Sequence, residues 1–163
     1  MNTLTLTKTA LAIVMLGVAG LLFLRFLRAD AGVSEKAFFY DLSEQKVFIG
    51  RRTAVPPVKG INGAEAAAVR AVVISTTGDP RDKSSWKVAY LEKYSPELKQ
   101  QMETAQATGS SPAMGRAQAQ AHRFVKRTSD SQWFPMDSPQ GEAIVSDWAM
   151  PGPNGVTPVV CAP

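Results

Sequence analysis

An uncharged apolar run near the N-terminus constrains this chain more than any other feature of its sequence. Residues 9–24, TALAIVMLGVAGLLFL, carry no charge, and Phe26 and Leu27 extend the run around Arg25. A helix rises ~1.5 Å per residue, so roughly 19 residues nearly match a ~30 Å hydrocarbon core. The pattern predicts a transmembrane anchor over residues 1–28 and one domain over residues 29–163.

Two alternatives to a retained signal anchor remain open. Ala29-Asp30-Ala31 has the small-x-small form of a signal-peptide cleavage site. However, Arg25 and Arg28 lie between the apolar run and that site, whereas signal peptides usually carry their positive charge at the other end. The second alternative is a buried core helix, which a run this long and apolar disfavours. The sequence therefore favours a retained signal anchor.

The side of the membrane on which the domain lies is poorly determined by charge. Lys8 precedes the run and Arg25, Arg28 and Lys36 follow it, so the positive-inside rule leans slightly towards a cytoplasmic domain. N-terminal anchors more often leave a short tail inside and send the domain out. We expect a single-pass protein of the bacterial inner membrane, with its domain on the periplasmic side.

The net charge of +4 does not indicate a nucleic-acid partner. Of the 18 lysines and arginines, 3 flank the apolar run, which leaves 15 against 14 acidic residues after Ala29, a net charge of +1. A nucleic-acid interface needs a basic face. The expected partners are therefore the lipid bilayer and other protein chains, including copies of this one, and no nucleic acid.

The first part of the domain has the pattern of a β-hairpin. Phe38, Tyr40 and Leu42 alternate with other residues, a polar SEQK follows, and Val47 with Ile49 begins a second run. This spacing is typical of two strands joined by a short loop. An isolated hairpin is marginal in water, so later elements must cover its apolar face.

Further strands follow along the chain. Residues 68–77, AVRAVVISTT, are apolar on both faces, which predicts a central strand with Val69, Ala71 and Val73 on one side. Residues 86–94, WKVAYLEKY, predict its antiparallel partner, and residues 122–127 predict a short strand. The partner's expected apolar face consists of Trp86, Val88, Tyr90 and Tyr94.

Two serine-proline pairs predict helix starts. Ser95-Pro96 and Ser138-Pro139 each combine an N-cap residue with proline at the first helical position. A third, alanine-rich helix or a mobile segment follows Ser111-Pro112. Together these patterns predict an α+β fold, with an N-terminal transmembrane helix, a small antiparallel sheet and two or three helices.

The sequence shows no constellation typical of catalysis. Cys161 and His122 are the chain's single cysteine and histidine, too few for a zinc site, and no nucleophile elbow accompanies His122. Asp79 and Asp82 in GDPRD are better explained by turn formation than by cation binding, and no phosphate-binding glycine motif occurs. Cys161 is expected to be a small buried hydrophobe. The sequence predicts no catalytic, cofactor-binding or metal-binding residue, and no cofactor.

Four blocks carry a resemblance to a known group of proteins. The blocks are FFYDLSEQKVF, VPPVKGINGAEAAAVRAVVIST, YLEKYSPELK and the terminal GVTPVVCAP. They resemble segments of small single-pass membrane proteins from planctomycete-type bacteria. The resemblance covers most of the domain, implies no activity and transfers no catalytic residue.

An apolar N-terminal helix followed by a small α+β domain is also similar, in architecture alone, to type IV pilins and pseudopilins. Those proteins carry a processing site before the helix and a glutamate within it, and residues 9–24 contain neither. We expect a non-catalytic, membrane-anchored structural or interaction subunit of a larger assembly. The alternatives are a pilin-like filament subunit that polymerises through the apolar helix, and an anchored enzyme of unknown chemistry.

Overall fold

A computed structural model describes residues 15–25 and 34–163 of the chain. The chain divides into two compact units, Met1–Ser34 and Glu35–Pro163. The predicted domain boundary at residues 28 and 29 lies outside the described residues.

The predicted transmembrane helix is wrong. In the first unit residues 15–25 form a helix whose residues are all exposed. The described part of this helix covers about 17 Å at ~1.5 Å per residue, against a ~30 Å hydrocarbon core. Among the described residues no helix combines the length and the apolar character needed to cross a membrane. The remaining parts of the expected anchor, 1–14 and 26–28, lie outside the described residues.

Two further expectations depended on that helix and are corrected with it. They are the signal-anchored, single-pass topology and the location in the bacterial inner membrane. The expected fold class is accordingly wrong in its membrane-spanning part. The described chain is an α+β fold built on an antiparallel sheet.

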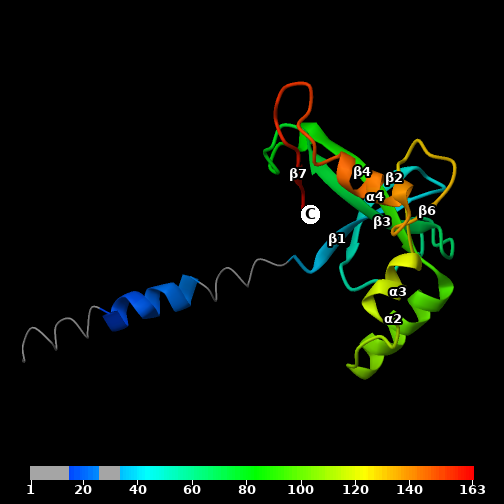
Figure 1. The fold of residues 1–163 in the computed structure, drawn as a ribbon, viewed down its shortest axis with the longest axis horizontal. Coiled ribbons are helices and arrows are strands. Elements are labelled where there is room, and N and C mark those ends of the chain that lie inside the picture. Colours follow the sequence, from blue (N-terminus) through cyan, green and yellow to red (C-terminus); the bar gives the residue numbers. More distant parts are fainter. Residues whose placement is uncertain (1–14, 26–33) are drawn as a thin grey trace, which may run out of the picture. The chain divides into compact units, whose positions relative to one another are not determined.

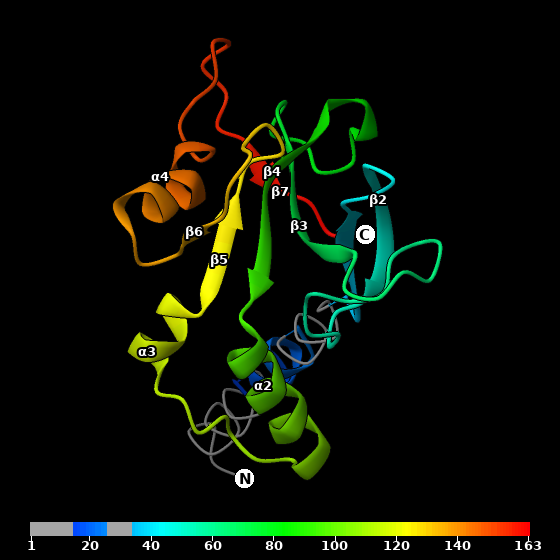
Figure 2. The same cartoon turned by 90° about the vertical axis from the view of Figure 1, so that its right-hand side faces the viewer.

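The second unit is a curved antiparallel sheet with helices at its end and side (Figure 1). Within residues 34–163 the sheet has seven strands, in the order β2-β1-β3-β4-β5-β6, and β7 pairs with β3. Figure 2 shows α2 and α3 at one end of the strands and α4 beside β5 and β6. The strands are β1 (Lys36–Asp41), β2 (Lys46–Arg51), β3 (Ala68–Ser75), β4 (Trp86–Tyr94), β5 (Arg123–Lys126), β6 (Phe134–Pro135) and β7 (Val159–Val160). The helices are the 3-10 turn η1 (Lys83–Ser85), α2 (Pro96–Thr108), α3 (Arg116–Ala121) and α4 (Pro139–Asp147).

The predicted hairpin and central strand are both present. β1 and β2 pair from Lys36 opposite Arg51 to Asp41 opposite Lys46. β3 is central because β4 pairs along one side of it, while β1 and β7 pair with successive parts of the other side. Its β-branched residues fit a strand that is covered on both faces.

A β-bulge divides β4 between two core clusters. The register of β3 against β4 shifts between Val72 and Val73. As a result Trp86 and Val88 pack against the first cluster, whereas Tyr90 belongs to the second. The expectation of one shared face for Trp86, Val88, Tyr90 and Tyr94 is therefore wrong, because the extra residue of a bulge reverses the alternation. The first cluster is Phe38, Val69, Ala71, Val73, Leu91 and Cys161; the second is Tyr90, Val125 and Ile144.

Both serine-proline pairs begin helices as predicted. The Ser95 hydroxyl accepts a hydrogen bond from the Leu98 N–H at the start of α2. The Ser138 hydroxyl accepts one from the Gly141 N–H at the start of α4. α2 buries Leu98 and Ala105, and α4 buries Ile144 against the second cluster. The alanine-rich helix α3 starts later than Ser111-Pro112 and has no buried residue.

Candidate interaction surfaces

The carboxylate of Asp41 fixes the end of β1. The side chain is 1% exposed and accepts four hydrogen bonds, from the N–H and hydroxyl of Ser43 and from the N–H groups of Glu44 and Ile61. The Ser43 hydroxyl, followed by the N–H groups of Glu44 and Ile61, lowers the pKa of Asp41 to about 2. A Cβ atom at Gly60 would collide with this carboxylate, so glycine is needed there. Asp41 thus joins the hairpin turn to the connector around residue 61.

This carboxylate is expected to make the stability of the domain dependent on acid pH. Its folded pKa, about 2, is below the ordinary aspartate value of about 3.9. The contribution is therefore present in full above about pH 4 and disappears as the pH falls through about 2. Urea unfolding at a series of pH values should show that the free energy of unfolding falls in this window. The fall should be smaller in Asp41→Asn than in the wild-type chain. Ser43→Ala should move the loss to higher pH; an unchanged profile in both variants would contradict this role.

Glu92 forms the most buried ion pair of the described residues. Its side chain is 6% exposed, and one carboxylate oxygen accepts bonds from Nη2 of Arg123 at 2.7 Å and from Nε at 2.9 Å. Arg70, opposite Glu92 in the register, donates to the carbonyl oxygens of Arg52 and Ala54. These bonds satisfy a buried acid and join β4 to β5, which is a structural role.

His122 has a partner that the sequence did not indicate. The hydroxyl of Ser95 lies 2.9 Å from Nδ1 of His122, and the carboxylate of Glu97 lies 4.0 Å from the same nitrogen. In a nucleophilic relay the base contacts its nucleophile and its orienting acid through different ring nitrogens. Because both groups here approach Nδ1, and because Ser95 also caps α2, the cluster is structural.

The remaining residues considered from the sequence serve the fold. The side chain of Asp79 accepts a hydrogen bond from the Arg81 N–H, and the side chain of Asp82 caps η1. Both are turn residues, as the sequence predicted. Cys161 is free and 5% exposed within the first core cluster, and burial raises the pKa of its thiol. In the described parts of the chain, no group of three or more histidine, cysteine or acidic side chains could hold a metal ion.

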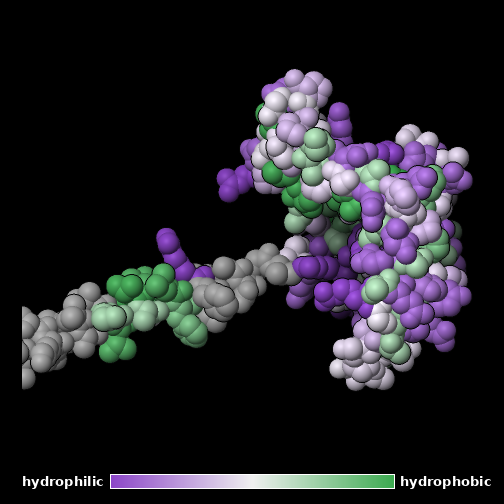
Figure 3. Space-filling model, in the orientation of Figure 1, coloured by the Kyte–Doolittle hydropathy of each residue, from purple (hydrophilic) through white to green (hydrophobic). Residues whose placement is uncertain are grey.

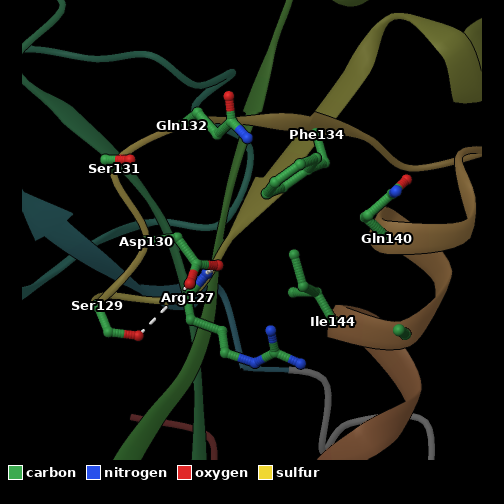
Figure 4. A pocket seen from close by; sticks show the side chains of 9 residues that line it. Arg127, Ser129, Asp130, Ser131, Gln132, Phe134, Gln140 and Ile144 are labelled. Carbon is green, nitrogen blue, oxygen red and sulfur yellow. Dashed lines mark hydrogen bonds between the residues drawn. The ribbon is translucent and has the colours of Figure 1, made fainter.

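A groove lies between α4 and the loop that precedes β6. It has a volume of about 450 Å³, and Figure 4 shows Phe134 and Ile144 at one side and the loop from Ser129 to Gln132 at the other. The guanidinium of Arg127 is already paired with Asp147 at 2.7 Å. The groove therefore offers little unpartnered charge to a ligand.

β2 is an edge strand, and no other strand in residues 34–163 pairs with its outer side. The Arg52 N–H donates to the Glu35 carbonyl, so the alternate residues Val47 and Ile49 direct their backbone groups away from β1. Their side chains are 42% and 55% exposed. Lys46 and Arg51 flank these residues, and charged flanks are typical of edges that avoid uncontrolled pairing.

The helix over residues 15–25 is the most apolar surface among the described residues. On the side that Figure 3 shows, most of its surface is hydrophobic. Val18 and Leu22 lie on one side of the helix, whereas Leu16 and Phe23 lie roughly opposite them, at ~100° per residue. The exposed fractions are Met15 66%, Leu16 73%, Val18 52%, Leu21 66%, Leu22 62%, Phe23 61% and Leu24 53%.

Comparisons with protein-family models, with curated proteins and with solved structures found no match to this chain.

Proposed function

We propose that this protein is a non-catalytic structural or interaction subunit that assembles with other copies of its own chain through the helix over residues 15–25. The observation that supports this proposal is the exposure of seven large hydrophobic side chains on that helix. Exposed apolar patches of this kind mark surfaces that a partner covers.

The distribution of these side chains favours several neighbours over one. Burying seven such side chains completely is worth on the order of 10 kcal/mol. A single partner covers one side and gains roughly half of that, against an association cost of about 4–15 kcal/mol. In a bundle of like helices each helix has two or more neighbours, so more of these side chains are covered than by a single partner. Self-association into a bundle is therefore the arrangement that the apolar helix supports best.

The same helix supports a pilin-like filament as the second candidate. A filament and a closed bundle bury the same side chains, and they differ in whether the contact closes on itself. The mass of a closed bundle reaches a plateau as the protein concentration rises, whereas the mass of a filament continues to grow.

Sedimentation of the full chain over a wide range of concentration tests the proposal. The wild-type chain should form an oligomer, and Val18→Glu/Leu22→Glu should sediment as a monomer, because two charges cannot be buried in an apolar bundle without partners. Ile61→Glu/Met150→Glu is the matched control. It adds the same charges at exposed apolar positions of the second unit, 49% and 68% exposed, and should remain oligomeric.

Two outcomes would contradict the proposal. One is a wild-type chain that stays monomeric at every concentration. The other is a chain that leaves solution only when lipid vesicles are added.

A further inference from the structure

Lys93 carries a half-buried charge that no acid in residues 34–163 neutralises. Its side chain lies on the same face of β4 as Leu91, and its ammonium nitrogen is 4.6 Å from the centre of the Trp133 ring. None of the ion pairs found in the described residues involves Lys93. A partly buried charge without an opposite charge is costly, so this site is suited to an anion.

A second lysine strengthens the positive potential at the same place. The ammonium of Lys126 is 5.3 Å from the centre of the Trp133 ring and donates to the carbonyl oxygen of Asp130 at 3.2 Å. That acceptor is a neutral carbonyl, so the charge of Lys126 also remains unbalanced. Burial, followed by the charge of Lys126, lowers the pKa of Lys93. A bound anion would offset both effects.

Lys93 borders a pocket with aromatic walls. The pocket has a volume of about 280 Å³, near the lower limit for small-molecule sites. Phe124 stands opposite Lys93 in the register of β4 and β5, and Trp133 packs over this face of the sheet. Ser95 and Pro96, at the N-terminus of α2, complete the lining, and the positive end of the helix dipole also favours an anion. The lining residues are Lys93, Tyr94, Ser95, Pro96, Phe124 and Trp133.

We propose that this pocket binds a small organic carboxylate with an apolar or aromatic body. The carboxylate pairs with the ammonium of Lys93, and the body lies against the rings of Trp133 and Phe124. Lys126 contributes from the Trp133 ring without lining the pocket, so its effect is electrostatic and smaller. The pocket is on a different unit from the helix over residues 15–25, so the site does not depend on the proposed self-association.

Titration of the full chain with phenylacetate tests this proposal. The indole N–H resonance of Trp133, assigned by its loss in Trp133→Phe, should shift on binding, because the ligand lies against that ring. Phenylacetamide has the same body without the charge and should bind at least about tenfold more weakly, which corresponds to about 1.4 kcal/mol. Inorganic phosphate, which lacks the apolar body, should also bind more weakly.

Three lysine variants separate binding from structural effects. Lys93→Gln should weaken phenylacetate binding about tenfold or more, and Lys126→Gln should weaken it about two- to threefold, because its charge acts from farther away. Lys87→Gln is the matched control, since Lys87 is an exposed lysine of the same strand, and it should leave the affinity unchanged. Thermal unfolding of each variant verifies that the fold is retained.

Three results would overturn the proposal. The first is equal binding of phenylacetate and phenylacetamide. The second is equal binding of phosphate, which would mean an anion site without an apolar subsite. The third is an affinity for phenylacetate that changes neither in Lys126→Gln nor in a folded variant at Lys93. If Lys93→Gln does not fold, Lys93→Met takes its place in this comparison.

Discussion

The free energy of unfolding is expected to fall by about 3 kcal/mol when Gly141 is replaced by alanine, at the upper end of the usual cost of overpacking. Gly141 is buried in the first turn of α4. A Cβ atom there would overlap the carbonyl oxygen of Pro135 and lie 2.9 Å from Cα of Met136. Both contacts are with backbone, so no side chain can rotate away. The helix would have to move off β6, which also displaces Ile144 from the second core cluster.

The sign of this effect is diagnostic because helix propensity acts in the opposite direction. Alanine is favoured over glycine in a helix by about 1 kcal/mol, so a substitution without a clash would stabilise α4. Urea unfolding measures the difference. Gly115→Ala is the control, since a Cβ atom at Gly115 meets nothing within 4 Å; as an N-cap substitution it should cost less than about 1 kcal/mol. Equal effects of the two substitutions would mean that α4 does not pack this closely.

The helix starts could be predicted because capping is local. Ser95-Pro96 and Ser138-Pro139 each place an accepting hydroxyl and a fixed φ within one turn of the N–H group that they satisfy. No distant residue has to be known for such a prediction. β3 could be predicted for a related reason, since a run of β-branched residues that is apolar on both faces fits few other positions in a fold.

The division of β4 between two clusters could not be predicted from alternation. Trp86, Val88 and Tyr90 follow a period of two, and sequence periodicity cannot show that the pairing with β3 shifts beside Val73. Bulges depend on how two strands meet, and nothing in either strand alone indicates one. The extra residue places Tyr90 beneath α4 instead of beside Trp86.

The candidate site was missed for the same reason. Lys93 and Trp133 are 40 positions apart in the sequence, and only the pairing of β4 with β5 and the turn into β6 bring them together. Asp41 and Ile61 likewise meet across the connector that follows β2. The sequence signal available at Lys93 was one of three charged residues in a partly apolar strand, and this pattern alone is equally typical of a solvated face.

The membrane prediction failed because hydropathy measures composition and not helix length. Residues 9–24 carry no charge, but the described helical residues are 15–25, and no helix among the described residues is long and apolar enough to cross a membrane. The apolar character of the run is nevertheless present in the fold as exposed side chains. The same residues that suggested a lipid partner therefore support the proposed contact between chains.

Phe39→Ala is expected to cost about 3–5 kcal/mol of unfolding free energy, the usual range for a buried phenylalanine. The side chain is 1% exposed, its ring stacks on Phe48 with centroids 5.8 Å apart, and the guanidinium of Arg70 lies 5.4 Å from its centroid. Truncation would leave a cavity on the face of β1 and β2 that carries this ring and would remove the ring against which Arg70 packs. Urea unfolding measures the loss, and Phe39→Leu, which retains most of the volume, should cost clearly less.

The packing of Gly50 against this ring provides a sharper test. A Cβ atom at Gly50 would lie 2.9 Å from two ring carbons of Phe39, so Gly50→Ala should destabilise the wild-type protein. In the Phe39→Ala background the obstructing ring is absent, and the same substitution should cost much less. The two substitutions are therefore expected to be non-additive, with the double variant more stable than the sum of the single effects predicts. Strict additivity would show that the Phe39 ring does not occupy the space beside Gly50, and the expected cavity cost would then have no structural basis.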